Sequence, residues 1–151
     1  MRLTLHTDYA LRTLLYLGAR PTVRISIRAI AEAYGISENH LVKVVHRLGQ
    51  GGFIKTIRGR GGGLLLARPA EEISIGIVVR FTEEDMTLVD CNGASPGGRA
   101  CLLSPNCPLR SVLGEALQAF LGVLDRYTLV DLMKPTDLAI LFPELGFVDK
   151  G

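Results

Sequence analysis

The sequence contains three cysteines, and they lie together in one short stretch. Nine residues separate Cys91 from Cys101, and five separate Cys101 from Cys107. Thiolates this close together favour a soft metal centre, either a zinc ion or an iron–sulfur cluster. The C-x-x-C pair that is common in zinc sites is missing from the sequence. Three cysteines also leave a fourth position for a ligand of another type, which suits a centre that must respond to a signal.

Direct oxidation of the thiols, without a cluster, is the alternative chemistry for these residues. An odd number of cysteines cannot all pair within one chain, and a reducing compartment disfavours structural disulfides. We expect that compartment to be the cytoplasm, and we expect no membrane partner. No apolar run approaches the roughly 18 residues of a membrane span, and the first residues lack the apolar segment of a signal peptide. We do not expect an enzyme, because no nucleophile–base pair, phosphate-binding loop or carboxylate pair indicates catalysis.

Charge divides the chain into two unlike halves. Residues 1–80 contain twelve Lys and Arg against five Asp and Glu, whereas residues 81–151 contain five against ten. A basic half joined to an acidic half indicates a nucleic-acid-binding module fused to a part with a different task.

The elements of the basic half predict a helix-turn-helix. We expect a first helix from about Thr4 to Gly18, a short second helix over 27–34 and a third over 37–50. Gly35 ends the second helix, and the small Ala31 four residues earlier allows the two helices to cross closely. The third helix, which Ser37 is placed to cap, is therefore the candidate recognition helix.

A basic hairpin is expected directly after the third helix. Residues 53–58 and 64–67 predict two strands, and the glycine-rich tip over 59–63 carries a single arginine, Arg60. A hairpin in this place makes the module a winged helix, and a basic tip favours contact with phosphates or the minor groove. The side chains expected to contact DNA are Ser37, Asn39, His40, Lys43, Arg58 and Arg60.

The rest of the chain is expected to hold a fourth helix over 73–81, an irregular segment with the cysteines, and an amphipathic helix that begins at Pro108. We expect that last helix to pack against a second copy of the chain, with packing onto the first helix as the alternative. The predicted fold is mainly α with a small β-hairpin wing: a winged helix-turn-helix plus a long C-terminal dimerisation helix. The expected divisions are a DNA-binding domain (1–80), a cluster-binding loop (81–107), a dimerisation helix (108–132) and a tail (133–151).

Several motifs carry a family resemblance that covers about residues 1–132. They are Met1–Arg12, Ser37–Lys43, the Arg58–Gly63 wing, Leu88–Cys91 with the two later cysteines, and Leu124–Leu132. Together they resemble the winged-helix repressors of the NsrR type, a family that also contains the cluster-biogenesis regulator IscR. The resemblance implies a homodimeric repressor with one iron–sulfur cluster per subunit, expected to be [4Fe-4S] with [2Fe-2S] as the alternative. It also implies that DNA is released when nitric oxide nitrosylates the cluster. A two-fold dimer predicts an operator with inverted-repeat half-sites.

The resemblance implies that Asp8 of the partner subunit is the fourth cluster ligand. Arg12, four residues later on the same helix face, is expected to orient Asp8 or to hold it when the cluster is lost. Solvent or His6 are the alternatives for the fourth ligand, and the charge of a helix N-terminus is another reason for an aspartate there. The chain departs from IscR because Arg110 stands where IscR has a histidine, three residues after the last cysteine. The segment between Cys91 and Cys101 is also longer than the compact form of the family. A zinc- or thiol-based redox-sensing regulator of transcription remains the alternative function.

Overall fold

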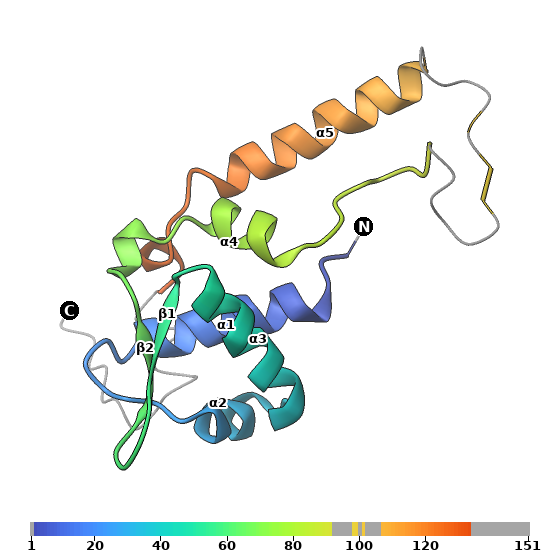
Figure 1. The fold of residues 1–151 in the computed structure, drawn as a ribbon. Coiled ribbons are helices and arrows are strands. Elements are labelled where there is room, and N and C mark those ends of the chain that lie inside the picture. Colours follow the sequence, from blue (N-terminus) through green and yellow to red (C-terminus); the bar gives the residue numbers. More distant parts are fainter. Residues whose placement is uncertain (1, 92–97, 100, 102–106, 134–151) are drawn as a thin grey trace.

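The computed structural model describes residues 2–91, 98–99, 101 and 107–133. Most of the glycine-rich gap between Cys91 and Cys101 and nearly all of the expected tail therefore lie outside the described residues. In chain order the elements are α1 (Leu5–Gly18), α2 (Ile27–Tyr34), α3 (Glu38–Gln50), β1 (Ile54–Ile57), β2 (Gly63–Leu66), η1 (Ala70–Glu72), α4 (Ile75–Thr82), α5 (Pro108–Leu124) and η2 (Val130–Leu132). Figure 1 shows α1, α2, α3 and the hairpin gathered in one body, with α4 between that body and α5. This is the winged-helix architecture that the sequence predicts.

The first three helices form where local signals place them. The Thr4 side chain accepts a hydrogen bond from the Thr7 backbone at the start of α1, and Ser26 caps α2 by accepting one from Ala29 N. Each cap satisfies a backbone donor that has no partner within its helix. The predicted bounds of these helices are confirmed to within a residue.

One apolar core holds the helices and the hairpin together. Its fully buried members come from α1, α2, α3, β2 and α4, from the residue before Ser74 and from the turn after α5, and burial of their apolar area stabilises the fold. They are Ala10, Leu14, Leu17, Ile30, Leu41, Val44, Leu48, Leu64, Ile73, Val78, Val79 and Leu129.

The hairpin is a two-stranded antiparallel sheet that gains a third pairing. Its register runs from Ile54 opposite Leu66 to Ile57 opposite Gly63. The first strand is one residue shorter at each end than the expected 53–58, since Phe53 and Arg58 lie outside the ladder. The second strand is shifted by one residue from the expected 64–67, since Gly63 joins the ladder and residue 67 does not. On its other edge β2 pairs at Leu64 with Ile25, which lies just before α2.

The junction between α4 and α5 corrects two expected helix bounds. The fourth helix begins at Ile75 instead of residue 73, because the Ile73 carbonyl accepts a hydrogen bond from Leu129 N at 2.8 Å. The last helix ends at Leu124, short of residue 132, because the chain then turns back towards α4. The Ile75 amide donates to the Tyr127 carbonyl at 3.0 Å, and this bond fixes the turn.

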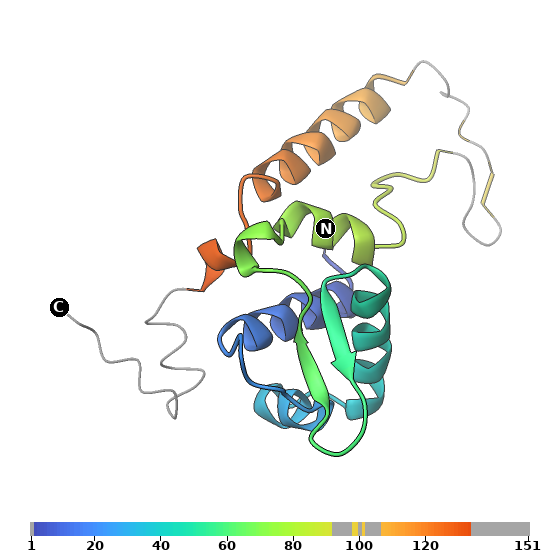
Figure 2. The ribbon, with the colours of Figure 1, turned by 60° about the vertical axis from the view of Figure 1, so that its left-hand side comes forward.

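Within one chain, α5 packs against α4, not against α1 as the alternative expectation had it. Figure 1 and Figure 2, which show the fold from two directions, both place α5 along α4 with one end extending past the body. Leu121 is its one buried residue, whereas Leu109 and Val112 near its start are 58% and 61% exposed. No helix in the described part of the chain is both long enough and apolar enough to cross a membrane.

Candidate nucleic-acid interface and candidate metal centre

The exposed side of α3 carries the side chains that the sequence predicts for DNA contact. Asn39, His40 and Lys43 are exposed, while Leu41 and Val44 on the other side of the helix lie in the core. Ser37 occupies the N-cap position, but its hydroxyl makes no capping hydrogen bond, so the expected capping role is wrong. The polar side of α3 is therefore held outward by the apolar side beneath it.

The turn between α2 and α3 is the one that a helix-turn-helix needs. Gly35 adopts the left-handed conformation, with φ 63° and ψ 33°, which a residue without a Cβ tolerates at little cost. The Ile36 amide then donates to the Ala31 carbonyl at 2.9 Å. Because Ala31 and Ile36 are both buried, the chain enters α3 at a fixed angle to α2.

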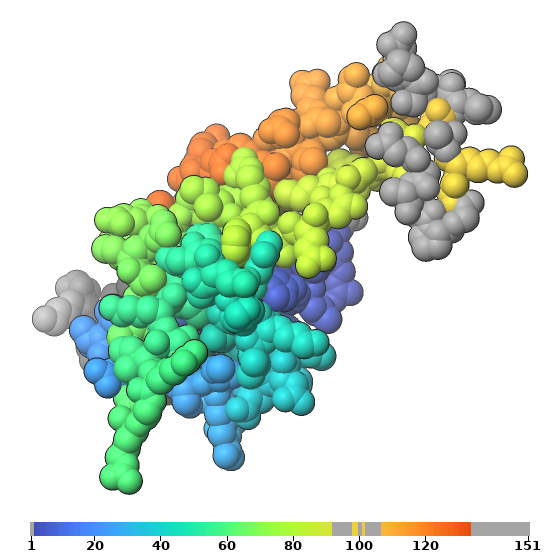
Figure 3. Space-filling model, in the orientation of Figure 1, coloured from blue at the N-terminus to red at the C-terminus, as the bar shows by residue number. Residues whose placement is uncertain are grey.

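The wing projects from the body as a narrow finger (Figure 3). Arg58 and Arg60 are exposed, and the flanking Gly59 and Gly61 have φ of 91° and 74°. Both arginines that the sequence predicts for DNA contact thus lie on one projecting hairpin. Sequence reasoning missed Arg24, whose guanidinium Nη1 donates to the Gly61 carbonyl at 3.0 Å.

Not every basic side chain of the module is available to a phosphate in the same way. Arg28 pairs with Glu32 at 2.7 Å, and this hydrogen bond raises the pKa of Arg28. Arg68 donates two hydrogen bonds to the Gly52 carbonyl and so belongs to the base of the wing. Lys43, Arg58 and Arg60 are exposed and lie on α3 and the wing.

The three cysteines are free thiols in different settings. Cys91 and Cys101 are half-buried, and the Cys101 amide donates to the Cys91 carbonyl at 3.0 Å. Cys107 is buried and occupies the N-cap position of α5, where the helix N-terminus favours negative charge. Among the described residues no three Cys, His, Asp or Glu side chains converge as a metal site. The donor set nevertheless fits a soft metal centre, because all three thiols are free and a backbone hydrogen bond joins Cys91 to Cys101.

A hollow of about 580 Å³ adjoins Cys91. Residues 85–91 form one wall, and the first turns of α5 with Arg110 form the other. Arg110 thus brings a cation to the cysteine segment.

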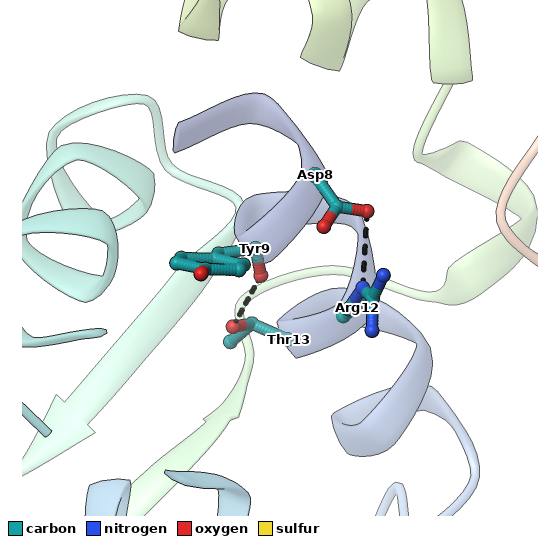
Figure 4. A network of polar contacts seen from close by, with 4 residues as sticks. All are labelled: Asp8, Tyr9, Arg12 and Thr13. Atoms are coloured by element: carbon teal, nitrogen blue, oxygen red, sulfur yellow. Dashed lines mark hydrogen bonds and ion pairs between the residues drawn. The ribbon is translucent and has the colours of Figure 1, made fainter. Parts of the chain in front are cut away.

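Asp8 lies in the first turn of α1, where Arg12 holds it (Figure 4). Arg12 Nε is 3.0 Å from Asp8 Oδ1, and the two side chains are 46% and 40% exposed. The Arg12 guanidinium also lies 5.8 Å from the ring centre of Tyr34, the last residue of α2. Burial raises the pKa of Tyr34, and the charge of Arg12 opposes that shift. Arg12 therefore contacts both the candidate ligand and the end of the helix that precedes recognition helix α3.

A second polar contact joins the start of α1 to the segment that leads to the cysteines. The Thr7 hydroxyl donates to the buried Thr82 hydroxyl at 2.9 Å, and the Thr4 amide donates to the Glu83 carboxylate at 2.7 Å. Sequence reasoning missed both contacts, and no local pattern marks either Thr82 at the end of α4 or Glu83 just after it. They fix the start of α1 to the point where the cysteine segment leaves the body.

Comparisons with known proteins agree with this architecture. Residues 3–135 match the model of the Rrf2 family, described as an iron-dependent transcriptional regulator. The chain is 54% identical over 135 residues to the HTH-type transcriptional regulator NsrR of Bacillus subtilis, covering 89% of this chain and 91% of that protein. It is also 54% identical over 135 residues to the regulator of the same name in Geobacillus kaustophilus, covering 89% and 90%.

Solved structures show the same likeness. CymR (YrzC), the global cysteine regulator of B. subtilis, superposes with a TM-score of 0.72 at 26% identity, over 88% of this chain and 96% of that one. IscR of T. potens gives a TM-score of 0.71 at 24% identity, over 90% and 88%, which is a likeness of fold.

Proposed function

The chain belongs to the Rrf2 family of transcriptional regulators and is not an enzyme, and from this premise we propose that it is a cytoplasmic, nitric-oxide-responsive repressor. In this proposal a homodimer binds its operator when each subunit holds an iron–sulfur cluster. Reaction of the cluster with nitric oxide lowers the affinity for the operator. The name NsrR of the relatives from Bacillus subtilis and Geobacillus kaustophilus supports this function over others in the family.

The observation that carries the proposal is the position of the cysteine segment. It leaves the DNA-binding body at Thr82 and Glu83, which contact the start of α1, and it ends at the N-cap of α5. A change at the cysteines is therefore connected to both the DNA-binding body and the helix proposed to form the dimer.

Cys91, Cys101 and Cys107 would hold the cluster through their thiolates. Asp8 of the partner subunit is the proposed fourth ligand, with [4Fe-4S] as the proposed cluster and [2Fe-2S] as the alternative. A bound cluster would supply iron that reacts with nitric oxide. Asp8 would be the weakest of the four ligands, because a carboxylate is a weaker ligand for soft iron than a thiolate. It is therefore the ligand that the chain could exchange most easily.

Arg12 gives Asp8 a second partner in the cluster-free state. With the Asp8–Arg12 ion pair at 3.0 Å, Arg12 also lies over Tyr34 at the end of α2. If Asp8 bound a cluster, Arg12 would lose its carboxylate partner, and its positive charge near Tyr34 would no longer be neutralised by Asp8. We expect this exchange to change the angle between α1 and the helix-turn-helix.

The DNA-binding surface consists of the exposed side of α3 and the wing. Asn39, His40 and Lys43 would reach base edges or phosphates in the major groove, and Ser37 at the N-cap position would contact the backbone. Arg58 and Arg60 would reach the backbone or the minor groove. In a two-fold dimer the two α3 helices read inverted half-sites about 10–10.5 base pairs apart from centre to centre.

The deciding experiment is anaerobic purification followed by absorbance and iron analysis. We expect a brown protein that contains iron and acid-labile sulfide, and we expect the Cys91→Ala, Cys101→Ala and Cys107→Ala variants to lose both while they keep their helical circular dichroism. Full iron content in all three variants would overturn the site. A colourless wild-type protein that contains zinc, or no metal and reversible thiol oxidation, would favour the alternative regulator. That alternative is supported by the backbone contact between Cys91 and Cys101.

Asp8 is tested separately from the cysteines. Asp8→Ala is expected to retain a cluster with altered absorbance and weaker operator binding, and Asp8→Cys to retain one that reacts more slowly with nitric oxide. If Asp8→Ala has unchanged absorbance, nitric-oxide reactivity and operator affinity, then Asp8 serves only as a charge at the N-terminus of α1.

DNA contact is tested by charge removal at matched positions. Lys43→Ala and Arg60→Ala are each expected to weaken operator binding by about 1–3 kcal/mol if the contacts are direct. Arg126→Ala, which removes one exposed positive charge next to α5, is the control and is expected to leave binding unchanged. Equal losses in all three variants would indicate an effect of net charge alone.

A further inference from the structure

The segment just before α2 lies against the wing along its backbone. Ile25 N donates to the Leu64 carbonyl at 3.1 Å, and Leu64 N donates back to the Ile25 carbonyl at 2.7 Å. Both side chains are buried, so this pairing is part of the core and not a surface contact. The wing is therefore attached to the helix-turn-helix on the side away from α3 as well as through β1.

Gly63 allows this close approach. A Cβ at Gly63 would lie 3.1 Å from the carbonyl carbon and the Cβ of Arg24, and 3.1 Å from Ile25 N. A side chain at Gly63 would push the segment away from β2. The glycine thus brings the Arg24 backbone to the edge of the wing.

From that position the Arg24 side chain reaches the tip of the wing. Its Nη1 donates to the Gly61 carbonyl at 3.0 Å across 37 residues of sequence. Gly61 directly follows Arg60, the arginine proposed to contact DNA. The hydrogen bond therefore fixes the Gly61–Gly62 peptide, one residue beyond Arg60, in a tip where all residues from 59 to 63 except Arg60 are glycine.

We propose that Arg24 is a positioning residue for DNA binding, which sets the wing tip so that Arg60 meets DNA when α3 lies in its groove. A glycine-rich tip has more backbone freedom to lose on binding than other sequences have. The Arg24 hydrogen bond reduces that freedom before DNA arrives, in addition to the bond from the Gly62 amide to the Gly59 carbonyl at 2.9 Å, so less ordering entropy opposes the complex. The inference rests on the proposed contact between Arg60 and DNA.

The test is a double-mutant cycle on the anaerobically purified, full-length protein. The probe is a duplex that the wild-type protein itself selects from a random DNA library, and binding is followed by fluorescence anisotropy. Arg24→Ala and Arg60→Ala are each expected to weaken binding about tenfold. The double variant is expected to bind within about twofold of Arg60→Ala alone, because Arg24 acts through Arg60. Arg24→Lys, which keeps a donor for the Gly61 carbonyl, is expected to restore part of the affinity, and Arg126→Ala controls for charge.

The salt dependence of the same variants separates positioning from direct contact. A phosphate contact by Arg24 itself would make the two losses additive and lower the salt slope by about one further unit in the double variant, and this overturns the inference. An Arg24→Ala variant that binds like wild type also overturns it. If Arg60→Ala binds like wild type, the wing contact in the proposed function fails, whatever Arg24 does.

A readout without DNA tests the same hydrogen bond. Trypsin cleaves after Arg58 and Arg60, and mass spectrometry identifies each cut. Cleavage at these two sites is expected to accelerate in Arg24→Ala but not in Arg126→Ala, at unchanged thermal stability. Equal cleavage rates in both variants would contradict a role for Arg24 in fixing the tip.

Discussion

Helices α3 and α5 differ greatly in how many of their residues are buried within one chain. The 13-residue α3 has four buried residues, Leu41, Val44, Val45 and Leu48, whereas the 17-residue α5 has only Leu121. The body that carries α3 is complete in a single subunit. The start of α5, with exposed Leu109 and Val112 beside the cysteine segment, has the pattern expected where a second copy covers it. Within one subunit, therefore, α3 has its apolar side covered by the core, whereas the start of α5 does not.

The largest expected effect is on stability, and it differs between a core residue of α3 and an exposed residue of α5. Leu48→Ala removes a fully buried side chain of the body and is expected to lower the free energy of unfolding by about 2–5 kcal/mol at every protein concentration. If the proposed dimer covers the start of α5, Leu109→Ala is expected to lower stability only through the dimer, so the shift of its urea midpoint from that of wild type should depend on protein concentration. A concentration-independent loss for Leu109→Ala as large as that of Leu48→Ala would contradict the comparison.

Gly76→Ala tests the place where the two regions are joined. A Cβ at Gly76 would overlap Asp125 Oδ1, which pairs with Arg80 Nη1 at 2.5 Å. Alanine is normally favoured over glycine inside a helix, but here overpacking is expected to cost about 1–3 kcal/mol in chemical denaturation. Gly122→Ala in α5 is the control, because a Cβ there meets nothing within 4 Å, and it is expected to be neutral or stabilising.

The buried threonine pair gives a smaller and directional effect. Thr82→Val leaves the buried Thr7 hydroxyl without its acceptor and is expected to cost about 1 kcal/mol or more. Thr7→Val is expected to cost less, because the Thr82 hydroxyl still donates to the Val78 carbonyl at 2.9 Å. Equal losses in the two variants, measured by urea denaturation, would show that the orientation of this pair is wrong.

The smallest expected effect is on the pH dependence of stability. The hydrogen bonds from Arg80 lower the pKa of Asp125 below its ordinary 3.8. Because the folded-state pKa is the lower one, the stabilisation is present above about pH 4 and is lost as the pH falls further. Asp125→Asn is therefore expected to lose less stability than wild type between about pH 5 and about pH 3. If the stability of the two proteins changes with pH in the same way, the Arg80–Asp125 ion pair does not contribute to holding α5 against α4.

Patterns local in sequence predicted the helices, the αL turn at Gly35 and the wing, because caps, glycines and apolar periodicity act over a few residues. They also placed Lys43, Arg58 and Arg60 on the surface. Contacts over long sequence distances were not predictable in this way. Arg24 and Gly61 are 37 residues apart, and Thr7 and Thr82 are 75 apart. Periodicity indicates which side of a helix is buried, but it does not name the partner.

The same limit explains the last helix and the candidate metal centre. The apolar spacing of α5 predicts a buried stripe, but not that α4 is its partner or that the helix stops at Leu124. The cysteines were found from their spacing alone. A ligand from another subunit leaves no pattern in the sequence around the cysteines, so Asp8 was reached only through the family resemblance and remains a proposal.

The attachment of α5 at one end has a mechanical consequence. Seventeen residues at about 1.5 Å each make α5 a rod of about 25 Å. Its Asp125 end is clamped to Arg80, and its Cys107 end lies at the cysteine segment. A tilt of about 5° at the clamp moves the Cys107 end by about 2 Å over that length. Under the proposed function, a displacement of the Cys107 end by about the length of one metal–ligand bond would therefore need only a small rotation between α5 and the body to which Arg80 joins it.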